Sequence, residues 1–72
     1  GDDVRAIARA ILPAIAEEVG REATVTEEAL AALAGWSWPG NVRELENELR
    51  RAVALSSGAI GPDDLSPRIL AG

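Results

Sequence analysis

The sequence predicts an all-α fold, a small bundle of three main helices followed by a short C-terminal helix. Three observations predict it: Ala, Leu, Glu and Arg dominate, apolar residues recur at helical spacing, and Gly or Pro separates the helical segments. We interpret residues 1–72 as a single domain that is a piece of a larger protein. A domain of this size buries only about 60% of its unfolded surface, so its core is thin.

The first helix is expected over residues 3–19, where apolar side chains recur on one face. This stripe consists of Val4, Ile7, Ala8, Ile11, Ile15 and Val19. Gly20 ends the helix, since glycine commonly follows the last helical residue. Pro13 lacks the N–H that would bond to the Arg9 carbonyl, so we expect a kink or a broken turn near residues 9–13.

The second helix is predicted to follow Thr26 and to reach about Ala34. Thr26 is its N-cap, and Val25 and Leu30 occupy the two positions of a hydrophobic staple. A short connection over residues 21–25 precedes it, and no strand is expected.

The third helix is predicted from Val42 to about Ser56, after a turn in which Pro39 and Gly40 block helix continuation. Gly40 is expected to supply an unusual backbone angle. The apolar stripe of this helix consists of Val42, Leu45, Leu49, Ala52 and Val53, with Ser56 at its end. Its other faces carry Glu44, Glu46, Glu48, Arg50 and Arg51.

A short fourth helix is predicted to begin with Gly61 and Pro62, because proline at the first helical position costs no hydrogen bond. It should be interrupted at Ser66–Pro67, since a residue before proline avoids the helical region. Residues 68–72 are expected to fray.

Residues 38–45, Trp-Pro-Gly-Asn-Val-Arg-Glu-Leu, combine a turn, a helix cap and a cation. Asn41 is a favoured N-cap, and Glu44 follows it at the spacing of a capping box. Arg43 occupies the second helical position, where the helix dipole disfavours a cation. We therefore expect Arg43 to serve a group outside the helix. Trp38 is interpreted as a packing anchor, because Trp is usually buried.

The composition argues against several functions. The chain has no His and no Cys, which removes His- and Cys-based catalysis and thiolate metal sites. It also lacks a phosphate-binding P-loop and an acidic cluster for Mg²⁺, so the isolated chain should be no enzyme, with no catalytic residue, metal site or cofactor of its own. A net charge of −5 argues against direct DNA contact. No apolar run reaches the roughly 20 residues that span a membrane.

The run from Trp38 to Asn47, continued by residues 50–55, resembles one family. This family is the C-terminal helical lid of the AAA+ ATPase domain in NtrC-like sigma-54-dependent bacterial transcription activators. Asp3-Val4, residues 26–30 and residues 60–65 are similar to its other lid segments, in the same order. The resemblance therefore covers nearly the whole chain.

The resemblance implies a cytoplasmic bacterial parent protein that hydrolyses ATP with Mg²⁺ and remodels sigma-54 RNA polymerase. The lid would cover a nucleotide held by an upstream α/β subdomain, within a homo-hexamer of neighbouring protomers. Arg43 matches the sensor II arginine, and a guanidinium suits phosphate because it forms bidentate, charge-assisted hydrogen bonds. Structural support of this site would come from Trp38, Pro39, Gly40, Asn41 and Glu44. Trp36 replaces the usual tyrosine and should be half exposed where the ATPase core would cover it.

Two other interpretations remain open. The second and third helices could imitate a DNA-binding helix-turn-helix, although phosphates would repel Glu44, Glu46 and Glu48. A stand-alone helical protein-interaction module without nucleotide or DNA binding is the better alternative. In that module Arg43 would be a solvated arginine paired with Glu46 or Asn47. The lid hypothesis requires strand–P-loop–strand sequence upstream, whereas the module requires an unrelated neighbour.

Overall fold

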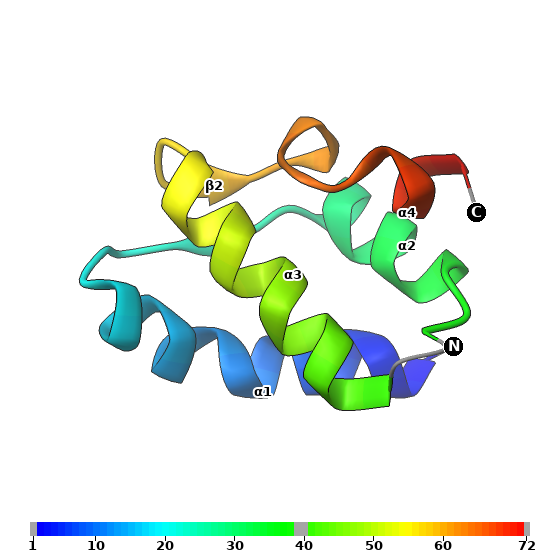
Figure 1. The fold of residues 1–72 in the computed structure, drawn as a ribbon, viewed down its shortest axis with the longest axis horizontal. Coiled ribbons are helices and arrows are strands. Elements are labelled where there is room, and N and C mark those ends of the chain that lie inside the picture. The colour runs from blue at the N-terminus through cyan, green and yellow to red at the C-terminus, as the bar shows by residue number, and fades with distance from the viewer. Residues whose placement is uncertain (1, 39–40, 72) are drawn as a thin grey trace.

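The computed structural model describes residues 2–38 and 41–71, apart from the side chains of Asp2 and Asn41. Its elements in chain order are α1 (Asp2–Val19), β1 (Thr24–Val25), α2 (Glu27–Gly35), α3 (Asn41–Leu55), β2 (Ala59–Ile60), the 3-10 helix η1 (Pro62–Asp64) and α4 (Pro67–Ala71). Three longer helices and a short C-terminal one form the structure, so the predicted all-α class is confirmed. Figure 1 shows α3 crossing the molecule, with α1 along one side and α2 and α4 on the other.

The core lies where these helices meet. α1 packs against both α3 and α2, and α2 packs against α4. The largest fully buried side chains are Leu30, Leu33, Leu49, Val53, Ile60 and Ile69. Burying an aliphatic side chain of this size stabilises the fold by about 1.5–3 kcal/mol, so the apolar stripes supply most of the favourable energy.

α1 continues as one helix through Pro13, so the predicted broken turn near residues 9–13 is wrong. Pro13 is exposed, whereas Leu12 and Ile15 on either side of it are buried in the core. Packing of that buried face offsets the hydrogen bond lost at proline, which costs about 3 kcal/mol in a helix interior. The helix ends at Gly20 as predicted, and the φ of +85° at this residue suits glycine.

Two very short strands form a parallel ladder that the sequence did not predict. Thr24 pairs with Ala59 and Val25 pairs with Ile60. The Thr26 N–H extends the ladder by donating to the Ile60 carbonyl at 3.0 Å. The expectation of no strand is therefore wrong, and the ladder ties the start of α2 to the segment that follows α3.

The N-cap of α2 is confirmed. The Thr26 hydroxyl accepts a hydrogen bond from the Ala29 N–H at 3.1 Å, and the helix spans Glu27–Gly35. Thr26 thereby satisfies one of the backbone donors that a helix leaves unpaired at its start.

The C-terminal segment divides as predicted, but residues 68–71 do not fray. η1 ends at Asp64 and α4 begins at Pro67, so the expected interruption at Ser66–Pro67 is confirmed. Residues 68–71 are helical and the Ile69 side chain is buried in the core. The prediction of fraying is wrong over residues 68–71 because this apolar side chain docks α4 onto the bundle.

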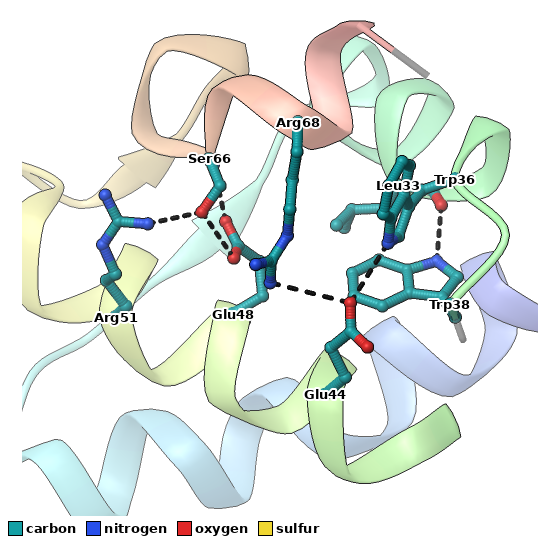
Figure 2. Close-up of polar contacts among 8 residues, drawn as sticks. All are labelled: Leu33, Trp36, Trp38, Glu44, Glu48, Arg51, Ser66 and Arg68. Atoms are coloured by element: carbon teal, nitrogen blue, oxygen red, sulfur yellow. Dashed lines mark hydrogen bonds and ion pairs between the residues drawn. The ribbon is translucent and has the colours of Figure 1, made fainter. Parts of the chain in front are cut away.

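α3 begins at Asn41, one residue earlier than predicted, and ends at Leu55. Most of its predicted stripe is buried, but Val42 is 43% exposed. Glu48 is only 4% exposed, although the sequence placed it on a polar face. That face is covered because Ser66, immediately before α4, lies against it (Figure 2).

Candidate functional site

The first turn of α3 carries the candidate nucleotide-sensing residue. Arg43 lies in this turn with its side chain exposed, as a residue that serves another molecule must be. Three of its predicted supports cannot be compared with the structure: Pro39 and Gly40 lie outside the described residues, and so does the Asn41 side chain. The capping box and the unusual angle at Gly40 therefore stay predictions.

Trp38 is the packing anchor that the sequence predicted. Its indole is buried, and its Nε1–H donates to the Leu33 carbonyl at 2.7 Å (Figure 2). The hydrogen bond satisfies the polar atom of the ring inside the core. Trp38 also has a φ of +52°, a left-handed conformation that is costly for a residue with a side chain. The buried ring holds the chain in this conformation as it turns from α2 toward α3.

Glu44 connects the first turn of α3 to two other segments. Its Oε1 accepts a hydrogen bond from the Trp36 Nε1–H at 3.1 Å and lies 3.6 Å from Nη2 of Arg68 in α4. Figure 2 shows the Glu44 carboxylate reaching toward both partners. Trp36 is partly buried against the core, which agrees with its predicted half exposure. The sequence placed Glu44 in the site but missed both partners.

A small apolar groove lies between the N-terminal ends of α1 and α3. Its volume is about 160 Å³, and it is lined by Val4, Ile7, Trp38, Val42 and Leu45. Val42 directly precedes Arg43 in the first turn of α3, so the groove and Arg43 lie at the same end of this helix, although Arg43 does not line the groove. A larger, open hollow of about 430 Å³ is lined by residues between Pro13 and Glu22, at the other end of α1. We place the site at the smaller groove because it lies at the same end of α3 as Arg43.

A second polar cluster joins α3 to α4. The Glu48 carboxylate accepts hydrogen bonds from Ser66, and Nη1 of Arg51 donates to the Ser66 hydroxyl (Figure 2). The cluster holds the chain immediately before α4 against α3. Sequence analysis missed it because its members are 15 and 18 residues apart and share no motif.

Two kinds of feature are absent from the described residues, a cluster of three metal-binding side chains and a membrane-spanning helix. Over residues 2–38 and 41–71, no three acidic side chains gather where they could bind a metal ion. In the same ranges, no helix has both the length and the apolar character that crossing a bilayer requires.

The sequence matches the family model of the AAA+ ATPase lid domain over residues 1–72. The chain belongs to the AAA+ ATPase lid domain family. The family predicted from the Trp38–Leu55 sequence is thus confirmed, and Arg43 lies on the third helix of the lid.

Several bacterial regulatory proteins contain a similar lid. The hydrogenase transcriptional regulatory protein HoxA of Cupriavidus necator is 49% identical over 57 residues, which is 78% of the lid and 12% of that protein. The regulatory protein AtoC of Escherichia coli is 39% identical over 70 residues, which is 94% of the lid and 15% of AtoC. The Nif-specific regulatory protein of Klebsiella pneumoniae is 43% identical over 63 residues, 86% of the lid and 12% of that protein. The lid thus spans a small part of these relatives.

Proposed function

We propose that this lid carries the sensor II arginine of a sigma-54-dependent transcription activator, and that Arg43 is this residue. The observation that supports the proposal is that Arg43 is exposed in the first turn of α3, at the end of the helix that also borders an apolar groove. A guanidinium forms bidentate, charge-assisted hydrogen bonds with phosphate oxygens. It also stabilises the negative charge on a phosphoryl group during transfer.

The nucleotide itself is proposed to be held by an α/β subdomain upstream of residue 1. The 72 residues include no P-loop, so the phosphate cradle and the Mg²⁺ ligands are assigned to that subdomain. The same subdomain is proposed to cover the groove formed by Val4, Ile7 and Val42. An apolar groove at the same helix end as a cation suits an interface that also encloses a phosphorylated ligand, because covering this helix end removes water from it.

We further propose that the parent protein is a cytoplasmic bacterial enhancer-binding protein that acts as a homo-hexamer. The names of the relatives support a role in transcription, since they are regulatory proteins of bacteria. The lid would couple ATP hydrolysis to remodelling of sigma-54 RNA polymerase without touching DNA. The net charge of −5 supports a role without DNA contact, because DNA phosphates repel an acidic surface.

The proposal is tested by replacing Arg43 with alanine in the full-length protein. We expect ATP hydrolysis to fall by about one to three orders of magnitude, as the loss of one charge-stabilising donor typically causes. Arg9→Ala is the matched control, because Arg9 is an exposed arginine of α1 paired with Glu27 at 2.5 Å. Arg9→Ala should hydrolyse ATP like the wild type. Unchanged turnover in Arg43→Ala would remove Arg43 from the mechanism.

A further inference from the structure

Glu44 follows Arg43 directly in the chain, and its carboxylate is directed at groups outside α3. Oε1 accepts from the Trp36 indole at 3.1 Å and lies 3.6 Å from the Arg68 guanidinium (Figure 2). An acidic side chain in the first turn of a helix interacts favourably with the helix dipole even when it points into solvent. Glu44 does more, because the side chain is only 20% exposed and joins two separate segments.

The hydrogen bond to Trp36 is the stronger of these two contacts. A carboxylate that accepts from a partly buried N–H forms a charge-assisted hydrogen bond with little competition from water. Arg68 is 56% exposed, so solvent screens its attraction to the Glu44 carboxylate. We therefore expect the indole to fix the position of the carboxylate, with Arg68 in a supporting role.

Both partners are themselves anchored to the bundle. Trp36 packs against the core, and its backbone N–H donates to the Leu33 carbonyl at 3.3 Å at the end of α2. Arg68 precedes Ile69, whose side chain is buried and docks α4. Glu44 thus connects the first turn of α3 to two segments that pack against the core.

We propose that Glu44 is a positioning residue for Arg43. By fixing the first turn of α3 against Trp36 and Arg68, it holds the backbone from which the Arg43 guanidinium extends. This inference rests on the proposed function of Arg43. Glu44 touches no nucleotide in this scheme, and its effect on hydrolysis passes entirely through Arg43.

The test measures kcat and KM for ATP hydrolysis in the full-length protein. Glu44→Ala should lower kcat by about tenfold, since small misplacements of a reacting partner cost up to about a hundredfold. In an Arg43→Ala background the same change should lower kcat by less than about twofold, because two residues that act as one unit are not additive. A merely structural role would lower kcat equally in both backgrounds.

Three further variants distinguish positioning of Arg43 by Glu44 from an effect of the Glu44 charge and from an effect on folding. Trp36→Phe keeps an aromatic ring but removes the indole N–H, and should lower kcat in the same direction as Glu44→Ala. Glu44→Gln keeps an acceptor for the indole, and should restore most of the kcat that Glu44→Ala loses. Glu46→Ala is the control, because this carboxylate of the same helix lies 3.9 Å from Arg50 and touches neither partner of Glu44. It should leave kcat unchanged.

The outcomes distinguish the two proposals. If Arg43→Ala is slow but Glu44→Ala and Trp36→Phe are as fast as the wild type, positioning by Glu44 is wrong while the role of Arg43 stands. If Arg43→Ala is fully active, the sensor II proposal fails first, and Glu44 has no arginine to position. Should Glu44→Ala not fold, Trp36→Phe and Glu44→Gln decide the question, and equal kcat in wild type and Trp36→Phe overturns the inference.

Discussion

Ser66 donates both its backbone N–H and its hydroxyl to the carboxylate of Glu48, at 2.7 and 2.8 Å. Both residues are buried, and Ser66 immediately precedes α4 (Figure 2). Two hydrogen bonds to one carboxylate compensate for burying its charge, which would otherwise be costly. The pair therefore fixes the start of α4 on the middle of α3.

Glu48→Ala should lower the free energy of unfolding of the isolated chain by about 2–4 kcal/mol. The substitution leaves two buried donors of Ser66 without their acceptor, and each unsatisfied donor costs about 1–3 kcal/mol. Urea denaturation followed by circular dichroism measures this difference. Glu46→Ala is the control on the same helix, and it should change the stability by less than about 0.5 kcal/mol because its ion pair is exposed. Equal losses in both variants would contradict the role of Glu48.

Pro13→Ala should stabilise the isolated chain by about 1–3 kcal/mol. α1 is helical on both sides of Pro13, so alanine restores the N–H that bonds to the Arg9 carbonyl and improves helix propensity. Pro13 is exposed, so the smaller side chain leaves no hole in the core. The midpoint of thermal unfolding should rise accordingly.

The control for Pro13→Ala lies one residue further along. Ala14 is also exposed. Ala14→Gly should lower the free energy of unfolding by about 1 kcal/mol if α1 around Pro13 has the helix propensities of an ordinary helix interior. A lower melting temperature in Pro13→Ala would show that α1 depends on proline at this position.

Most of the fold could be predicted because its determinants are local. The apolar stripe of α1, the Thr26 cap and the stop at Gly20 all follow from residues a few positions apart, and the structure confirms them. The prediction for Pro13 failed because packing of the opposite helix face outweighed a local rule. Reasoning about one segment at a time could not show that α1 packs against the core on the face opposite Pro13.

The contacts that were missed join distant parts of the chain. The β1–β2 ladder links residues 35 positions apart through backbone atoms, and two-residue strands carry no periodic pattern. Glu48 was assigned to a polar face because nothing local indicated that Ser66 would cover it. Arg43 and Glu44 were identified from a motif, but the partners of Glu44 depend on how α2 and α4 pack.

Arg43→Ala should leave the stability of the isolated chain unchanged to within about 0.5 kcal/mol. Arg43 is exposed, and contacts of exposed charges contribute little to folding. Comparing the urea midpoints of wild type and variant measures the effect. A loss of several kcal/mol would show that this guanidinium stabilises the lid itself, and a slow full-length Arg43→Ala could then reflect damage to the fold.

The isolated chain should bind ATP no more tightly than in the millimolar range. One exposed arginine and a small apolar groove offer few contacts to a triphosphate, and the backbone donors of a P-loop are missing from the sequence. Isothermal titration calorimetry with Mg-ATP checks this expectation, and the full-length protein provides the comparison because it should bind more tightly. Micromolar binding by the 72 residues alone would mean that the lid forms a nucleotide site by itself. Loss of that binding in Arg43→Ala would then assign the site to the first turn of α3, with no need for an upstream phosphate cradle.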